Sequence, residues 1–288
     1  MKIGVSSYSF SSYRKATGAD YFDICDKAKE LSFDGIEFID IVAEGENTFE
    51  GRLALAKDIR SHCEKIGLEI PAYTVGADLV SENADDTVLK LFECLEITKA
   101  LGAKIMRHDV CTRLPEGWNY KDAICAAVPR IRRVADKAAQ IGITTCVENH
   151  GLIIQAPERV KELIEAVDRP NYGWLCDIGN FLCADCDPLE STKIAAEYTV
   201  HAHAKDFLFK AKGASGAWGF GIPTLGENAL RGTVIGHGVV PVLECIKALR
   251  NAGYNGYISL EFEGPEEPGY ALSAGAKNLM EFAAVIAK

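Results

Sequence analysis

Short runs of apolar and β-branched residues alternate with longer amphipathic stretches along the whole chain. The short runs predict buried strands, and apolar residues three and four positions apart predict helices. Residues 85–101 are typical of the longer stretches, because Val88, Leu91 and Leu95 fall on one helical face. The strand-and-helix unit occurs eight times, with predicted strands that begin at Ile3, Gly35, Glu69, Lys104, Thr144, Tyr172, Thr199 and Gly256.

Glycine follows the last apolar residue of four predicted helices, at Gly67, Gly102, Gly142 and Gly253. Glycine readily adopts the left-handed conformation in which many helices end. Regular βα units over 288 residues predict a closed (β/α)₈ TIM barrel, with residues 1–288 forming a single domain. The alternative is an open doubly wound sheet that binds a dinucleotide, and it lacks its G-x-G-x-x-G fingerprint after the first strand.

One long segment, residues 209–241, interrupts the rhythm between the seventh strand and its helix, and it is rich in glycine. We expect it to be irregular. In a barrel of this kind it lies at the carboxyl ends of the strands, where active sites occur. A lid over the site and a disordered insertion both fit this pattern, and the apolar residues Trp218, Phe220 and Leu225 favour some packing.

Charge and composition exclude several classes of partner. The chain has 31 Lys and Arg against 41 Asp and Glu, a net charge of −10, which argues against a nucleic-acid partner. It contains neither a run of about 18 apolar residues nor the apolar stretch of a secretory signal, so we expect a cytoplasmic protein without a membrane partner. The ten cysteines include one close pair, Cys183 and Cys186, which we interpret as incidental thiols rather than a zinc or redox site.

Four polar residues occupy the last inward position of the last four predicted strands: Glu148, Asp177, His203 and Glu261. Side chains alternate between the barrel interior and the helices, so these four converge at the carboxyl end of the barrel. Three carboxylates in one small volume repel one another unless a cation neutralises them. An oxygen-rich set with one imidazole favours one divalent metal ion, with Mn²⁺ first, then Mg²⁺, Co²⁺ or Zn²⁺.

The motifs around these residues are VENHG, CDIGN, HAHAKD and SLEFEG, with GHG before the eighth unit. Over its whole length the chain resembles the xylose-isomerase-like barrel superfamily of sugar phosphate isomerases and epimerases. That superfamily also includes hydroxypyruvate isomerases, inosose dehydratases and endonuclease IV. The resemblance implies that Glu148, Asp177, His203 and Glu261 bind one divalent metal, and that the two glutamates transfer protons as in the epimerases.

Three functions remain open from the sequence. The first is a metal-dependent isomerase or epimerase that moves a proton next to the carbonyl of a small sugar or sugar derivative through a metal-bound enediolate. The second is a lyase on the same scaffold, in which His150 removes the proton and a β-substituent leaves. The third is a non-catalytic sugar-binding or metal-binding protein. The sequence leaves the oligomeric state open, although homo-oligomers are common in the resembled family.

The chain departs from its resembled relatives at two places. Several of them carry His three residues after the strand-six Asp, where this chain has Asn180, which can bind a sugar hydroxyl but cannot transfer a proton. The DNA-repair enzyme also needs an Asp-x-His after strand seven, where this chain reads DFLFK. A DNA-repair role therefore fails on ligands as well as on charge.

Several further side chains are candidates for the substrate pocket. His150 follows Glu148 by two positions, and it is expected either to contact the substrate or to cap a loop carbonyl. Inward His201 is interpreted as a core histidine, and Lys205 is expected either in the pocket or paired with Asp206. The other pocket candidates are Arg107, His108, Glu37 and Trp218, with Tyr8, Phe10 and Trp118 as further aromatic walls.

Overall fold

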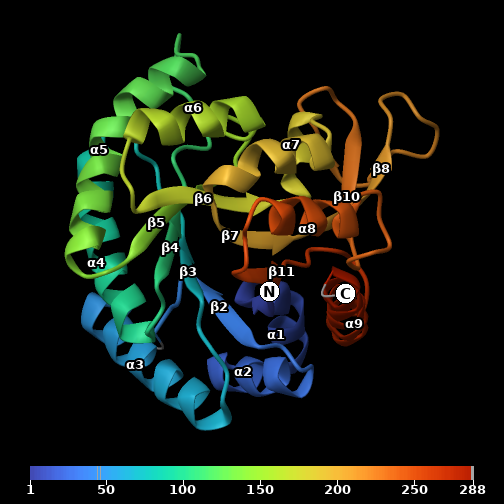
Figure 1. Cartoon of the computed structure of the whole chain (residues 1–288), viewed down its shortest axis with the longest axis horizontal. Helices are drawn as coiled ribbons and strands as arrows, with labels where there is room; N and C mark the ends of the chain where they lie inside the picture. The colour runs from blue at the N-terminus through green and yellow to red at the C-terminus, as the bar shows by residue number, and fades with distance from the viewer. Residues whose placement is uncertain (44, 46, 287–288) are drawn as a thin grey trace.

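Eight parallel strands form a closed barrel in the computed structural model, which describes residues 1–43, 45 and 47–286. The order around the barrel is β1, β2, β3, β4, β5, β6, β7 and β11 (Figure 1). The strands are β1 (Lys2–Ser6), β2 (Gly35–Ile39), β3 (Ala72–Val75), β4 (Ile105–His108), β5 (Thr144–Glu148), β6 (Tyr172–Asp177), β7 (Thr199–Ala204) and β11 (Tyr257–Leu260). The predicted (β/α)₈ barrel is confirmed.

All eight predicted strands are present, three of them with the predicted bounds: β2, β5 and β6. The predicted helix ends also hold, because the four glycines at the helix ends have positive φ, from 68° at Gly67 to 96° at Gly253. The barrel therefore follows from the local patterns of the sequence.

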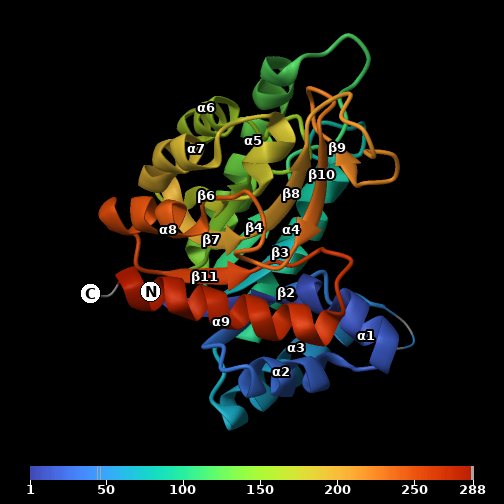
Figure 2. The ribbon, with the colours of Figure 1, turned by 90° about the vertical axis from the view of Figure 1, so that its right-hand side faces the viewer.

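Helices surround the barrel, and successive helices pack side by side around it (Figures 1 and 2). They are α1 (Ser11–Thr17), α2 (Tyr21–Glu30), α3 (Phe49–Ile66), α4 (Ala84–Leu101), α5 (Tyr120–Gln140), α6 (Pro157–Val167), α7 (Pro188–Ala195), α8 (Val242–Asn251) and α9 (Pro268–Ile286). Short 3₁₀ turns lie at Ser7–Phe10, Asn180–Ala184 and Ala196–Tyr198. The apolar core fills the space between helices and strands, where Ile59, Leu95 and Val134 are fully buried.

The predicted alternation on β7 is wrong at one residue. A register shift between β6 and β7 places Thr199 opposite Trp174 and His201 opposite Leu175, which leaves Val200 between them without a partner. Val200 therefore lies against Gly173 instead of facing the helices. The two residues are so close that a Cβ added at position 173 would lie 2.6 Å from Val200 Cγ1. The bulge is confined to the start of the strand, so His201 and His203 keep their inward positions.

The segment after β7 is more regular than expected. Strands β8 (Asp206–Lys210), β9 (Ile222–Pro223) and β10 (Ala229–Thr233) form a small antiparallel sheet in the order β8, β10, β9 (Figure 2). Phe220 packs against two cations of this sheet, with Lys210 Nζ 5.0 Å and Arg231 Cζ 4.7 Å from its ring centroid. The expectation of an irregular segment is therefore wrong for the strand residues of 209–241, while the rest of that segment lies outside the named helices and strands.

The ten cysteines are free thiols, including the close pair Cys183 and Cys186. Within the described part of the chain, no helix has the length and apolar character that a membrane span requires.

Candidate metal centre

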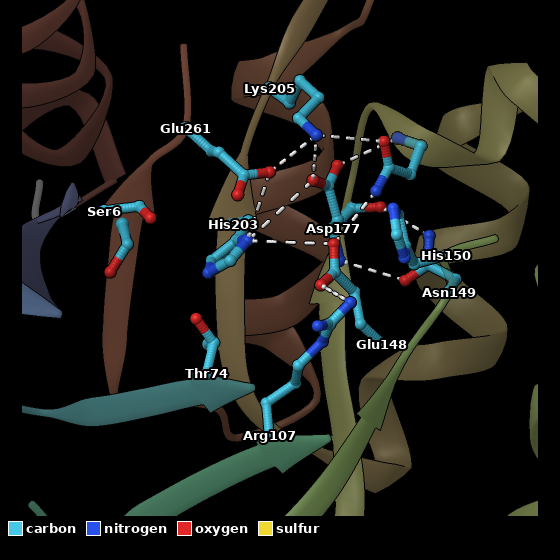
Figure 3. A network of polar contacts seen from close by, with 12 residues as sticks. Ser6, Thr74, Arg107, Glu148, Asn149, His150, Asp177, His203, Lys205 and Glu261 are labelled. Carbon is cyan, nitrogen blue, oxygen red and sulfur yellow. Dashed lines mark hydrogen bonds and ion pairs between the residues drawn. The ribbon is translucent and has the colours of Figure 1, made fainter. Parts of the chain in front are cut away.

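The carboxyl ends of β5, β6, β7 and β11 bring together the four residues predicted as metal ligands (Figure 3). Each offers one ligand atom, and these atoms all lie within 4.8 Å of one another. His203 Nδ1 lies 3.9 Å from Glu148 Oε1, 4.0 Å from Asp177 Oδ2 and 3.6 Å from Glu261 Oε2. All four side chains are buried.

Two atoms of this group have unmet bonding capacity. His203 Nδ1 and Asp177 Oδ2 are buried, and neither has a hydrogen-bond partner among the described residues. Buried polar atoms are normally paired, so both atoms are available as ligands for a cation. Three carboxylates and one imidazole are donors that Mn²⁺, Mg²⁺ and related ions accept. The residues therefore fit the divalent ion that the sequence predicts, and its identity stays open.

The backbone of the β6 turn fixes the orientation of Asp177. Its Oδ1 accepts hydrogen bonds from the amides of Gly179 and Asn180, at 2.8 Å and 2.9 Å, which turns Oδ2 toward the other ligands. Asn149 holds the neighbouring strand ends together, because it donates to the Asp177 carbonyl and accepts from the Asp177 amide. Burial raises the pKa of Asp177 to about 7, against the opposing effect of Lys205.

Glu37 holds the histidine ligand from across the barrel. Its fully buried carboxylate accepts hydrogen bonds from Nε2 of His203 and Nε2 of His201, and Ser259 Oγ donates to it at 2.9 Å. These bonds leave Nδ1 of His203 to face the carboxylates. Although burial opposes it, the two histidines hold the pKa of Glu37 well below its usual value. Glu37 was predicted to contact substrate, but it lies beneath the ligands and supports one of them.

Lys205 lies inside the acidic group. Its Nζ lies 2.6 Å from Glu261 Oε2, 3.5 Å from Asp177 Oδ2 and 3.6 Å from Glu263 Oε2. Although burial opposes it, Glu261 and the other carboxylates raise the pKa of Lys205 well above its usual value. Of the two predictions for Lys205, the pocket is therefore correct and pairing with Asp206 is wrong. Asp206 accepts backbone hydrogen bonds from residues 207, 236, 238 and 240 instead.

Glu148 has two partners besides the other ligands. Arg107 NH2 lies 2.8 Å from its Oε2, and Asn180 Nδ2 donates to its Oε1 at 3.0 Å. Lys205 Nζ in turn donates to Asn180 Oδ1 at 3.2 Å. Asn180 was predicted to bind a sugar hydroxyl, but it is buried and links Glu148 to Lys205.

Asp109, which the sequence analysis missed, connects His150 to this group. Its Oδ1 lies 3.0 Å from His150 Nδ1 and 2.7 Å from Arg107 NH2. The hydrogen bond to Asp109 raises the pKa of His150 above its usual value. His150 therefore contacts a carboxylate, rather than the loop carbonyl of the alternative interpretation.

A cavity of about 200 Å³ opens beside the ligands. Seven of the predicted ligand and pocket residues line it: Tyr8, Arg107, Glu148, His150, His203, Lys205 and Glu261. Ile39, Asp40, Thr74, Gly76, Asp109 and Glu263 complete the lining. Asp40 and Asp109 each follow directly on a strand, β2 and β4, so the signal that located the ligands was also present for them.

Besides Glu37 and Asn180, four predicted pocket residues lie outside the cavity: Phe10, His108, Trp118 and Trp218. His108 is fully buried outside the cavity, and its ring centroid lies 5.9 Å from that of Tyr172. Burial lowers the pKa of His108. Trp218 is 99% exposed between β8 and β9 and does not reach the cavity. No residue of 209–241, a segment described in full, lines the cavity. The lid therefore stays a prediction.

Residues 25–282 match the family described as "Xylose isomerase-like TIM barrel". The chain belongs to this family. An uncharacterized protein of Methanocaldococcus jannaschii, MJ1311, is 26% identical over 275 residues, which cover 91% of this chain and 83% of that protein. The family thus confirms the resemblance seen in the strand-end motifs.

Solved structures that share the fold include the following three. The probable 3-DHS dehydratase AsbF of Bacillus anthracis, involved in petrobactin synthesis, has a TM-score of 0.76 at 21% identity and covers 97% of this chain and 99% of its own. A xylose isomerase-like TIM barrel protein of Mycobacterium smegmatis in complex with magnesium has a TM-score of 0.74 at 18% identity, and the match covers 99% of this chain and 97% of that protein. A D-tagatose 3-epimerase-like protein has a TM-score of 0.69 at 21% identity, and the match covers 99% of this chain and 98% of that protein. At these identities the likeness shows the fold alone.

Proposed function

We propose that this chain is a divalent-metal-dependent isomerase or epimerase of a sugar or sugar derivative. The observation that carries the proposal is the position of Glu148 and Glu261, which line one cavity from strand ends that are separated by β6 and β7. Two carboxylates placed in this way approach a bound molecule from different sides. One can remove the proton next to a carbonyl and the other can return it.

The return site decides the product. A proton returned to the same carbon on the opposite face gives an epimer, and a proton returned to the adjacent carbon converts an aldose to a ketose or the reverse. A divalent ion held by Glu148, Asp177, His203 and Glu261 supplies Lewis-acid stabilisation of the negative charge that develops on the carbonyl oxygen. Asp40, Thr74 and Glu263 line the same cavity and offer hydrogen-bond partners to sugar hydroxyls.

A second candidate is a lyase, and the contact between His150 and Asp109 favours it. His150 lines the cavity but is not one of the four ligands, so it is a base that does not also have to hold a metal ion. In this reaction His150 takes the proton next to the carbonyl, a double bond forms between the two carbons, and the β-hydroxyl leaves as water with the proton that His150 has taken. The dehydratase with the same fold supports this alternative by analogy.

Proton exchange in D₂O separates these reactions. The Mn²⁺-loaded protein is incubated with a panel of ketoses, keto-inositols and 3-keto-glycosides, and products are analysed by mass spectrometry and NMR. An isomerase or epimerase incorporates deuterium next to the carbonyl and otherwise preserves the mass of the substrate. A lyase releases water or an aglycone. Absence of both reactions across the panel supports the binding protein and contradicts the proposal.

Three variants test the residues. Glu261→Gln keeps the shape of a base while removing its charge, so exchange falls about 10²- to 10⁴-fold in the isomerase or epimerase. Glu69→Gln is the matched control, because Glu69 pairs with Lys2 and Tyr257 at the other end of the barrel, and it leaves exchange unchanged. Exchange that survives in Glu261→Gln and is lost in His150→Ala contradicts the two-carboxylate mechanism and supports the lyase.

A further inference from the structure

His150 and Asp109 come from loops that the fold holds together. His150 lies two residues after β5, and Asp109 directly follows β4. Between the two loops, Gly151 has φ 79° and lies so close to the Cys111 carbonyl that a Cβ would approach its oxygen to 3.2 Å. A larger residue at 151 would therefore meet both a strained conformation and a close contact. The close contact between the loops after β4 and β5 therefore helps to hold His150 beside Asp109.

We infer that Asp109 is the positioning residue for His150, and that it sets the imidazole so that Nε2 faces the substrate as the acid–base atom. The inference rests on the second candidate under the proposed function, the lyase in which His150 is the base, because it assumes that the molecule in the cavity is a substrate from which His150 removes a proton. A carboxylate only accepts hydrogen bonds, so the ring nitrogen beside it, Nδ1, carries the hydrogen. In the neutral ring Nε2 then has the free lone pair.

The same carboxylate oxygen ties His150 to the ligand group. Oδ1 of Asp109 contacts both His150 Nδ1 and Arg107 NH2, and Arg107 NH2 in turn lies 2.8 Å from Glu148 Oε2. The chain of contacts runs from the imidazole through Asp109 and Arg107 to one ligand. Asp109 thereby fixes the place of His150 relative to the ligands, as well as the ring nitrogen that carries the hydrogen.

A purely structural role for Asp109 makes a different prediction. If Asp109 served only to neutralise Arg107, its removal would disturb Glu148 and weaken the binding of Mn²⁺. If it acts through His150, Asp109→Asn leaves Mn²⁺ affinity within about threefold while proton exchange falls about 100-fold, the cost of moving a reacting group by about 1 Å. The fall is in kcat, and KM changes less than twofold.

A double-mutant cycle isolates the path through the imidazole. In the His150→Ala background, Asp109→Asn has no further effect on exchange, because the group it positions is gone. Asp26→Asn is the matched control: Asp26 pairs with His62 at 2.7 Å, on the helices outside the barrel, and its loss leaves exchange unchanged. Additive losses from Asp109→Asn and His150→Ala would overturn the inference.

A spectroscopic readout does not depend on substrate. The chain has six histidines, so ¹⁵N NMR of the Mg²⁺-loaded protein at high pH resolves the hydrogen position on each ring. We expect the single ring hydrogen of neutral His150 on Nδ1 in the wild type, and divided between the Nδ1 and Nε2 tautomers in Asp109→Asn. An unchanged His150 signal in the variant would overturn the inference. If the wild type neither exchanges a proton with any compound of the panel nor releases water or an aglycone from it, the proposed function fails, while the NMR result still decides the role of Asp109.

Discussion

Glu37 is the residue on which the orientation of His203 depends. The carboxylate of Glu37 lies beneath the ligands and accepts a hydrogen bond from His203 Nε2. His203 Nδ1 is then available to bind the metal ion. We expect Glu37→Gln to weaken Mn²⁺ binding about 10- to 100-fold, as is typical for the loss of a carboxylate behind a histidine ligand. Isothermal titration calorimetry measures the affinity, with Glu69→Gln as the control. Equal affinities in wild type and Glu37→Gln would show that His203 needs no support.

The pKa of Asp177 predicts how metal affinity depends on pH. In the metal-free protein burial raises this pKa to about 7, so below pH 7 the carboxyl carries a proton that must leave before the oxygen can bind a cation. Mn²⁺ affinity therefore falls as the pH falls, by roughly 50-fold between pH 7 and pH 5 from one proton alone. Although burial opposes it, Glu37 and Glu261 raise the pKa of His203, which adds to the effect. Titrations with Mn²⁺ across this range would contradict the prediction if affinity stayed constant.

The sequence located the four ligand candidates because the alternation of strand residues needs only the strand ends, and those were clear. It failed where a role depends on contacts across the barrel. Glu37 occupies an inward position like the others, but one layer lower, and only the structure shows that two histidines lie against it. Trp218 was chosen for its aromatic ring, and nothing in the sequence showed that its segment projects away from the cavity.

At the level of elements, the insertion of β8, β9 and β10 is fastened by Asp185, in the loop after β6. Its carboxylate accepts hydrogen bonds from Thr224 Oγ1 at 2.6 Å, Asn228 Nδ2 at 2.7 Å and the Gly226 amide. The sequence predicted an irregular segment because its many glycines obscured the short strands. The pairing of β8 with β10 is made between segments 19 or more residues apart, which local patterns do not encode.

We expect Asp185→Ala to release the turn between β9 and β10 while the barrel stays folded. The variant loses three hydrogen bonds on one turn, so protease cleavage and amide exchange should increase within residues 209–230 and remain unchanged in the barrel strands. Hydrogen exchange measured by mass spectrometry resolves the two regions. Asp187→Ala is the control, because Asp187 caps only α7 through the Glu190 amide. Equal protection of residues 209–230 in Asp185→Ala and wild type would contradict the role of Asp185.

At the level of the whole molecule, the barrel was predictable because each βα unit is local and repeats eight times, so an error in one unit does not change the fold. The site is costly to this fold, because it buries several carboxylates around two cations, Arg107 and Lys205. A divalent ion offsets that cost. At a concentration 100 times the dissociation constant, Mn²⁺ stabilises a protein by about 2.7 kcal/mol, which corresponds to roughly 5–10 °C in melting temperature.

Asp177→Asn separates this stabilisation from the rest of the fold. Asparagine can still accept from the amides of Gly179 and Asn180, but it removes a charge whose Oδ2 has no hydrogen-bond partner among the described residues. Because the pKa of Asp177 is raised, its ionised form is disfavoured in the folded protein, and at pH 8 that form is present. We therefore expect the metal-free variant to melt above the metal-free wild type, by roughly 2–4 °C per kcal/mol gained.

The same variant should lose most of the Mn²⁺-dependent shift, since one of the four ligands is gone. Differential scanning calorimetry at pH 8, with chelator and with Mn²⁺, measures both effects on the same two proteins. At pH 5 the carboxyl of the metal-free wild type is protonated and uncharged, so the difference between the metal-free proteins should shrink. A metal-free Asp177→Asn variant that melts below wild type at pH 8 would show that Lys205 already compensates the carboxylate, and that the ligand group is stable without a metal ion.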